Sequence, residues 1–272
     1  NVLHYGLERF ARHIKEQGVE WDEISLEEME KLADSCVEEA VDSYGNTVLQ
    51  SDARNAYMVN RVKRMMRRTV WALAKQMEQG EFKPSRFEVS FAMADSLESV
   101  NIALSEEETM KLKGRIDRVD VCEDSENVYV KVIDYKSGNT AFDLVALYHG
   151  LQLQLVLYLN AAMELEQRAH PDKNVLPAGI FYYNIKDPIV DCVEKESEEA
   201  LNQRLLKQLR TNGLASADPE ILKRLDKGLE EKGVSSNTIP VSINKSGGLS
   251  KTSSAVDEEH FELVSGYVKH KI

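Results

Sequence analysis

The order of apolar and polar positions predicts a chain that begins as helices and continues as a sheet. Residues 1–17 carry apolar side chains at the spacing of an amphipathic helix, and Gly18 follows as a stop signal. A capping-box pattern at Ser25–Glu28 predicts a second helix to about Ser43, and a third is predicted over 51–79. The apolar stripe of the first helix consists of Leu3, Leu7, Phe10, Ala11 and Ile14.

The rest of the chain alternates between strand and helix patterns. Arg86–Met93 alternates apolar and polar residues, which predicts a strand. Val175–Ile185 is apolar almost throughout, which predicts a strand in the middle of a sheet. Further helices are predicted over 142–168, 194–233 and 257–269. This order of elements predicts an α/β fold with a mixed sheet.

Two strands joined by a polar turn are predicted between Lys111 and Ser137. Folding this segment about the centre of Ser125-Glu126 places Asp117 opposite Asp134. The same register sets valine against valine on one face, which indicates that this face is buried. Lys136 lies two residues beyond Asp134 and therefore leaves the same face. The valine pairs are Val119 with Val132 and Val121 with Val130.

The opposed carboxylates make this hairpin a candidate metal site. Directly opposed residues have Cβ atoms about 4.5–5.5 Å apart, so two carboxylates there repel each other unless a cation or a proton lies between them. Hard carboxylate oxygens suit Mg²⁺ or Mn²⁺. The alternative is an ordinary hairpin whose exposed end carries mixed charges, but acids are rarely buried unless they are paired or bind a metal.

Composition narrows the class of protein. The chain has 272 residues, 42% of them hydrophobic, which is enough for a sizeable core. A net charge of −12 argues against a generally basic nucleic-acid-coating protein. Cys36, Cys122 and Cys192 are far apart, which argues against a disulfide framework and a zinc site. With no long apolar run and no signal-peptide pattern, we expect no membrane association and a cytoplasmic location.

Three successive parts are predicted, which we expect to form one compact domain. Residues 1–79 form an N-terminal helical part that carries His4 and a basic helix. Residues 80–193 form the core with the sheet, and residues 194–272 form a C-terminal helical segment. Within the last part, the glycine- and serine-rich stretch at about 233–254 is expected to be a flexible loop.

Several further residues have two interpretations on sequence alone. The basic helix is either a solvated face or a phosphate track for DNA. Glu88 is either a further acid near the metal or a solvent-facing strand residue. Gln154 and Tyr158, at i and i+4, are either an active-site pair or a polar helix rim, and His4 beside an apolar stripe is more often an ordinary histidine. The cations of the basic helix are Arg54, Arg61, Lys63, Arg64, Arg67 and Arg68.

Four motifs in order carry a resemblance to a known family: GRIDRVD, VIDYKSG, GLQLQLVLY and PAGIFYYNIKDP. Together they resemble the nuclease domain of AddB (RexB) subunits of bacterial AddAB helicase-nucleases, which are RecB-type members of the PD-(D/E)XK superfamily. The resemblance implies a restriction-endonuclease-like sheet core. It also implies that Asp117, Asp134 and Lys136 form the metal and catalytic site, that Gln154 and Tyr158 are the Q-x-x-x-Y motif, and that His4 is an additional metal ligand.

The function implied by the resemblance is that of an Mg²⁺- or Mn²⁺-dependent deoxyribonuclease, an exonuclease of a helicase-nuclease in double-strand break repair. Its implied substrate is single-stranded DNA, and its implied partner is an AddA-type subunit. If the basic helix is a phosphate track, we expect Arg61, Arg64 and Arg68 to contact this DNA. Relatives commonly carry four cysteines that bind a 4Fe-4S cluster. This sequence lacks those four cysteines, so we expect a fragment of a longer parent, which could hold the cluster. The alternatives are an inactive DNA-binding or docking module and a metal-dependent phosphodiesterase acting on another nucleic acid.

Overall fold

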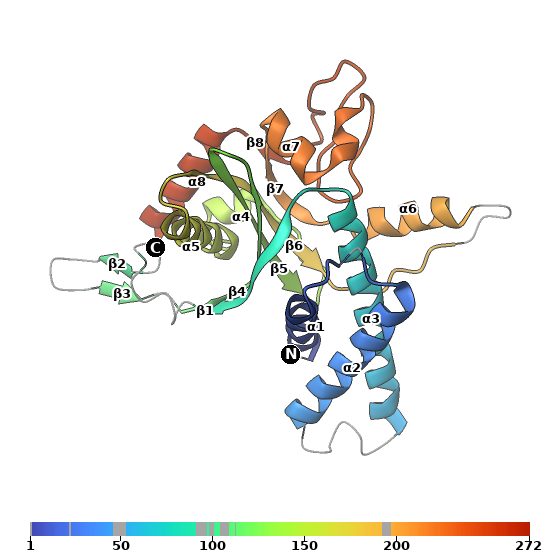
Figure 1. The fold of residues 1–272 in the computed structure, drawn as a ribbon. Helices are drawn as coiled ribbons and strands as arrows, with labels where there is room; N and C mark the ends of the chain where they lie inside the picture. Colours follow the sequence, from blue (N-terminus) through green and yellow to red (C-terminus); the bar gives the residue numbers. More distant parts are fainter. Residues whose placement is uncertain are drawn as a thin grey trace. The chain divides into compact units, whose positions relative to one another are not determined.

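The computed structural model describes residues 2–21, 23–45, 53–90, 97, 101–103, 109–111, 113–191 and 197–272. It confirms the predicted α/β fold with a mixed sheet (Figure 1). The chain divides into two compact units. A helical unit contains residues 1–78, 135–139 and 184–209, and a sheet unit contains residues 79–134, 140–183 and 210–272.

The helical unit begins with the three predicted helices. They are α1 (Val2–Gln17), α2 (Leu26–Gly45) and α3 (Ala53–Glu78), and the unit ends with α6 (Glu198–Gln208). The apolar stripe of α1 is buried, as its spacing indicated. The capping box that opens α2 is present, because Ser25 Oγ donates to the Glu28 carboxylate at 2.6 Å and accepts from the Glu28 backbone N–H at 3.3 Å.

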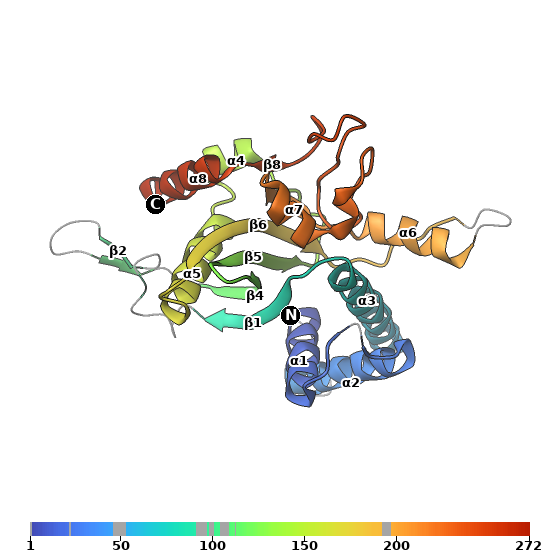
Figure 2. The same cartoon turned by 45° about the horizontal axis from the view of Figure 1, so that its top comes forward.

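A six-stranded mixed sheet forms the sheet unit, in the order β1-β4-β5-β6-β7-β8 (Figure 2). The β1–β4, β4–β5 and β6–β7 pairs are antiparallel, and β7–β8 is parallel. The strands are β1 (Lys83–Ser90), β4 (Arg115–Glu123), β5 (Asn127–Lys136), β6 (Asn174–Asn184), β7 (Asn212–Ser216) and β8 (Ala255–Val256). A separate two-stranded sheet contains β2 (Asn101–Ala103) and β3 (Thr109–Lys111).

The register of the central hairpin is the predicted one. Val119 pairs with Val132, and Val121 pairs with Val130, over a ladder that runs from Arg118–Ile133 to Glu123–Val128. One further step along this ladder brings Asp117 opposite Asp134. On this face Val119, Val130 and Val132 are buried and Val121 is half-buried, so both carboxylates lie at the end of an apolar surface.

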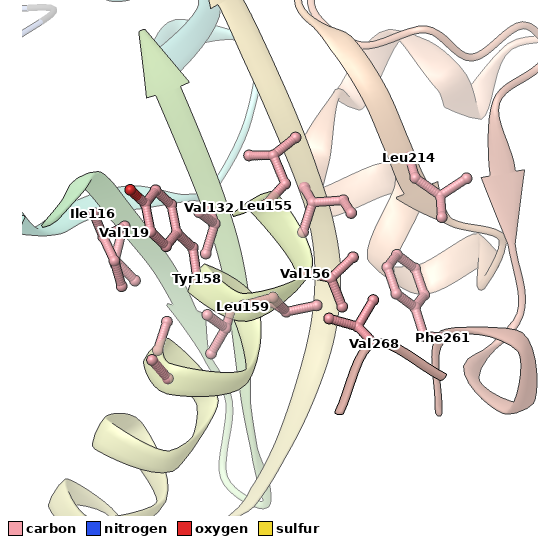
Figure 3. Packing of buried hydrophobic residues seen from close by; sticks show 14 of the residues in the cluster. Ile116, Val119, Val132, Leu155, Val156, Tyr158, Leu159, Leu214, Phe261 and Val268 are labelled. Atoms are coloured by element: carbon pink, nitrogen blue, oxygen red, sulfur yellow. The ribbon is translucent and has the colours of Figure 1, made fainter. Parts of the chain in front are cut away.

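Helices cover the two faces of the sheet. On the valine face lie α5 (Gln154–Ala169) and α8 (Glu258–Lys271), whose Leu155, Leu159 and Phe261 join one buried cluster (Figure 3). A second cluster contains apolar residues of α7 (Pro219–Leu225), of the 3₁₀ helix Lys227–Glu230 and of the sheet. Among the described helices, none has the length and apolar content needed to cross a lipid bilayer.

Two predicted helices are wrong in extent. The helix predicted over 142–168 is broken into α4 (Leu144–Tyr148) and α5, and Gly150 between them has φ of +81°, which glycine adopts readily. The helix predicted over 194–233 contains β7 between α6 and α7. Gly213 in β7 allows close pairing, because a Cβ there would lie 2.0 Å from the carbonyl oxygen of Ile180.

Smaller differences concern β1 and the 233–254 stretch. β1 begins at Lys83, three residues before the predicted strand, and residues 91–93 lie outside the described part. The 233–254 stretch contains only isolated bridges, at Ser235–Ser242 and Ile243–Leu249. Its Ile239 and Val241 are nevertheless buried in the second apolar cluster, so the stretch is packed on the sheet unit.

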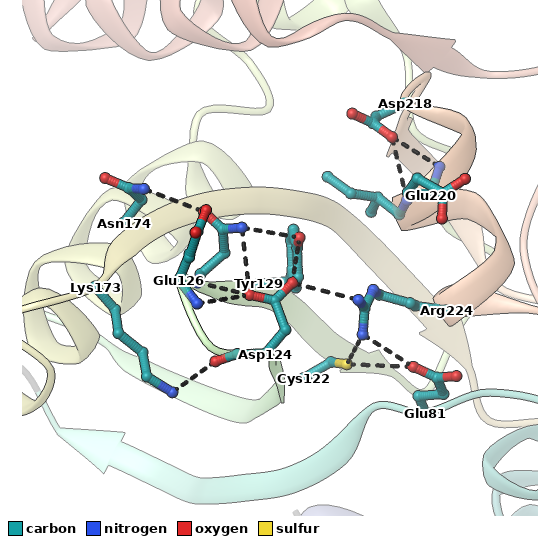
Figure 4. Close-up of polar contacts among 12 residues, drawn as sticks. Glu81, Cys122, Asp124, Glu126, Tyr129, Lys173, Asn174, Asp218, Glu220 and Arg224 are labelled. Carbon is teal, nitrogen blue, oxygen red and sulfur yellow. Dashed lines mark hydrogen bonds and ion pairs between the residues drawn. The ribbon is translucent and has the colours of Figure 1, made fainter.

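The turn of the central hairpin is held by Asp124 (Figure 4). Its carboxylate accepts from the backbone N–H groups of Glu126 and Asn127 at 2.9 and 2.8 Å and from the Tyr129 hydroxyl at 2.9 Å. These hydrogen bonds lower the pKa of Asp124 to about 2, with the Glu126 backbone contributing most. Arg224 of α7 also contacts this carboxylate, at 3.3 Å.

Substituting Asp124 with alanine is expected to lower stability and to make it less sensitive to acid. The folded-state pKa of about 2 lies below the ordinary value of 3.8, so the contribution of Asp124 is complete above about pH 4 and is lost as the pH falls through about 2. Urea denaturation of wild type and Asp124→Ala at pH 7 and pH 3 measures this. A stability difference that stays constant between the two pH values would contradict the assignment.

Candidate metal centre

Two buried carboxylates from neighbouring strands define the candidate centre. Asp117 is 7% exposed and Asp134 is 3% exposed. Both leave the valine face, because β4 and β5 pair in the register described above. Buried carboxylates close together are costly unless positive charge compensates them. The hairpin therefore forms a site that a bound cation would stabilise.

Glu88 of β1 belongs to the same group of acids. Its carboxylate and that of Asp117 have oxygens within 4.8 Å of each other, and its side chain is 7% exposed. The solvent-facing alternative for Glu88 is therefore wrong. Among described non-glycine residues, Glu88 has the one positive φ, +49°, a backbone state that commonly occurs at functional sites.

A β-bulge explains why Glu88 shares the face of Asp117. The β1–β4 register shifts by one residue between Pro84 and Arg86, and Phe87 then pairs with Arg118. Glu88, the next residue, consequently opposes Asp117. Without the shift it would oppose Ile116, because a slip of one residue exchanges the two faces of a strand.

The third acid of the GRIDRVD motif, Asp120, is already neutralised. It lies on the opposite face of β4, where Arg118 donates to both of its oxygens at 2.5 and 2.7 Å and Lys131 lies 2.9 Å away. Complete burial raises the pKa of Asp120, but Arg118 and Lys131 outweigh burial and hold it below the ordinary value. Asp120 therefore has its own cations and needs no metal.

Lys136 and His4 belong to the helical unit. β5 continues to Lys136, which by strand alternation leaves the same face as Asp134. His4 of α1 contacts Tyr135, the residue between them, with ring centroids 6.3 Å apart and an edge-to-face angle of 84°. The predicted helix histidine therefore packs against the strand that carries the D-x-K motif.

Gln154 and Tyr158 form a hydrogen-bonded pair on the first turns of α5. Gln154 Nε2 donates to the Tyr158 hydroxyl at 2.7 Å, and Tyr158 projects from α5 toward the sheet (Figure 3). Burial raises the pKa of Tyr158, and the charges of Asp134 and Asp117 raise it further. The backbone of Arg115, at the start of β4, also hydrogen-bonds this hydroxyl. The pair thus braces the strand that carries Asp117.

The donor set fits a divalent cation bound by oxygen ligands. Glu88 and Asp117, whose carboxylate oxygens lie within 4.8 Å of each other, supply the hard, charged ligands that Mg²⁺ and Mn²⁺ prefer. Asp134, on the strand next to Asp117, is a further buried carboxylate but is not part of this close group. Burial, followed by the negative charge of Asp134, raises the pKa of Tyr182 on β6 to about 12. A site of this kind can bind and polarise a phosphate group.

The cations of the basic helix separate into two sets. Lys63 forms an ion pair with Glu38, and Arg67 forms one with Asp34, so these two join α3 to α2. Arg61, Arg64 and Arg68 are on another side of α3, where Arg64 and Arg68 both contact Asp187. The predicted DNA contacts are therefore separate from the cations that hold the helices together.

The sequence patterns did not lead us to two charged residues near these groups. Arg115 forms an ion pair with Glu88, and Asp187 joins Arg64 and Arg68. The position of Arg115, two residues before Asp117 on the same strand face, was a usable signal. Nothing local identifies Asp187, because its partner Arg64 is 123 residues away.

The fold and the site place the chain in a known class of enzymes. Residues 1–239 match the PD-(D/E)XK nuclease superfamily. The chain belongs to this superfamily, which confirms the family predicted from the four motifs.

Curated relatives extend the similarity over the whole chain. It is 40% identical to the B subunit of the ATP-dependent helicase/deoxyribonuclease of Lachnoclostridium phytofermentans, covering 99% of this chain and 22% of the relative. The subunits of the same name from Caldanaerobacter subterraneus subsp. tengcongensis and Clostridium acetobutylicum are 38% and 36% identical, over 99% and 100% of this chain. The chain spans 23% of the length of each of these two.

Proposed function

We propose that this chain is the nuclease part of a helicase-nuclease and hydrolyses phosphodiester bonds of single-stranded DNA with Mg²⁺. The observation that carries the proposal is the burial of two carboxylates, Asp117 and Asp134, on two paired strands in a chain of the PD-(D/E)XK superfamily. Glu88 adds a third carboxylate to Asp117. In this proposal Asp117, Asp134 and His4 are metal ligands and Glu88 is an additional one.

When bound, the cation polarises the scissile phosphate and lowers the pKa of a nearby water. The chain's own residues prepare the rest of the site. Asp117 and Asp134 hold fixed negative charge at one end of an apolar face, where charge interactions are stronger than in water. Apolar residues of α5 exclude water from the floor of that face.

Lys136 acts on the reacting groups and not on the cation. Its ammonium, on the face of Asp134, positions the attacking water and offsets the charge that develops on the phosphate oxygens. Tyr158, held by Gln154, keeps the beginning of β4 in place through the Arg115 backbone and so fixes Asp117. We therefore assign Gln154 and Tyr158 to positioning.

The names of the relatives support a proposal for the partner of this chain and for the process in which it acts. Their shared name describes one subunit of an ATP-dependent helicase/deoxyribonuclease, which supports a larger protein that works with a helicase of the AddA type. We propose that such a helicase delivers single strands to this domain during double-strand break repair, in the cytoplasm, and that the domain acts as an exonuclease.

A substrate panel tests the proposal against its alternatives. The purified chain is incubated with Mg²⁺ and equal concentrations of labelled single-stranded DNA, duplex DNA, single-stranded RNA and a small phosphodiester. We expect cleavage of single-stranded DNA above all others and none with EDTA. Preference for RNA or for the small diester would favour a different phosphodiesterase. DNA binding without cleavage in Mg²⁺ or Mn²⁺ would favour an inactive binding module.

A further inference from the structure

α3 carries a stripe that contains four arginines and two aromatic residues. Its members are separated by three or four residues, which places them on one side of the helix. Lys63 and Arg67, which bind α2, are outside this stripe. The stripe is therefore distinct from the cations that join α3 to α2. Its members are Arg54, Tyr57, Arg61, Arg64, Arg68 and Trp71.

The middle of the stripe forms one wall of a groove within the helical unit. The groove has a volume of about 810 Å³, and its other walls are the turn 137–139 and the segment 185–189. The turn follows directly after Lys136 of the proposed active site. Among the described residues that line the groove, four are cations and one, Asp187, is an acid, in a chain whose net charge is −12. An anionic ligand fits this lining.

The carboxylate of Asp187 contacts the guanidinium groups of Arg64 and Arg68, where a phosphate could bind in its place. Arg64 donates to its carboxylate, and Arg68 lies 3.8 Å from it while its guanidinium stacks over Trp71 at 5.2 Å. A carboxylate and a phosphate satisfy such a pair of arginines in the same way. Arg64 is 66% exposed, so this ion pair is open to exchange with an incoming anion.

Apolar and aromatic side chains stand exposed at the same groove. Tyr57 is 66% exposed and Ile189 is 92% exposed. Tyr57 lies one helical turn from Arg61, so the two side chains are neighbours on α3. Sites for single strands combine aromatic rings that stack on bases with cations that contact the phosphates. Duplex DNA keeps its base faces stacked within the helix, so this combination favours a single strand.

We infer that this groove seats a single-stranded segment of the DNA substrate. A base stacks on Tyr57, one phosphate binds Arg61, and another takes the place of the Asp187 carboxylate between Arg64 and Arg68. The inference rests on the proposed function for its substrate class. It adds the path by which the strand reaches the end of β5.

Binding of about 12-nucleotide strands in EDTA, followed by fluorescence anisotropy over a range of salt concentrations, tests the path without cleavage. One strand is oligothymidine and the other has the same length but lacks bases. Tyr57→Ala should weaken binding of oligothymidine about tenfold and leave the abasic strand unchanged. Tyr148→Ala is the matched control, because Tyr148 of α4 is 63% exposed and does not line the groove.

Substitutions of the charged groove residues are expected to change the affinity for both strands, upward for the acid and downward for the arginine. Asp187→Asn should tighten binding of both strands, because no carboxylate then competes with the phosphate for Arg64 and Arg68. Arg61→Ala should weaken both strands equally. Equal effects of Tyr57→Ala on the two strands, or an unchanged affinity in Asp187→Asn with a folded protein, would overturn the inference.

Cleavage measured on the same proteins separates this inference from the proposed function. If the variants differ from wild type in binding as expected, but wild type does not cleave DNA in Mg²⁺, the groove inference is supported and the nuclease proposal is contradicted. If wild type cleaves single-stranded DNA, but Tyr57→Ala and Arg61→Ala bind it with the wild-type affinity, the nuclease proposal is supported and the groove inference is contradicted.

Discussion

Asp134→Ala is expected to lower the rate of Mg²⁺-dependent DNA cleavage by at least about 10³-fold. The substitution removes a ligand of the cation that polarises the phosphate, a contribution of several kcal/mol to the transition state. The folded state should be retained or become slightly more stable, because Asp134 is 3% exposed and faces the like charge of Asp117. Single-turnover cleavage and thermal unfolding on the same sample measure both effects.

Two comparisons make this result specific. Asp172→Ala removes an exposed acid from the turn before β6 and should leave the rate unchanged. Asp117→Ala should reproduce the loss seen in Asp134→Ala. A variant of Asp117 or Asp134 that cleaves at the wild-type rate in Mg²⁺ would remove that residue from the site.

Lys136→Ala is expected to lower the cleavage rate by about 10²- to 10³-fold while leaving divalent-metal affinity unchanged or higher. An ammonium group does not bind a cation, so its removal costs transition-state stabilisation without removing a metal ligand. Loss of its positive charge near Asp134 can only favour metal binding. Calorimetric titration with Mn²⁺ and a single-turnover assay separate the two effects.

Lys113→Ala provides the matched control for Lys136, since Lys113 is exposed and lies just before β4. It should change neither quantity. If Lys136→Ala loses metal affinity together with activity, Lys136 supports the architecture of the site. If Lys136→Ala cleaves at the wild-type rate, the lysine has no part in the reaction.

The hairpin that carries the acids could be derived from the sequence because its information is local. The polar turn sets the register of the two strands, and the paired valines show which face is buried. Asp117 and Asp134 are equally far from the turn, so their positions on this face could be predicted. The helix cap at Ser25 and Glu28 was derivable for the same reason. Where a turn and an alternating pattern agree, the register has few alternatives.

Other features depend on contacts that no local pattern contains. The place of Glu88 depends on a bulge near Pro84, which reverses the faces of β1 relative to β4. Strand β7 is short and contains Gly213, so its composition resembles that of a loop although it is largely buried. Asp187 reaches Arg64 across 123 residues. These features are set by packing partners and not by the propensities of the segments themselves.

The most direct test of the central claim is to locate the cation. Crystals of the chain grown with Mn²⁺ would be measured at a wavelength where manganese scatters anomalously. We predict an anomalous peak within coordination distance, about 2–2.5 Å, of carboxylate oxygens of both Asp117 and Asp134. A protein that cleaves DNA in Mn²⁺ but shows its manganese bound elsewhere, with no peak between these two carboxylates, would contradict the account.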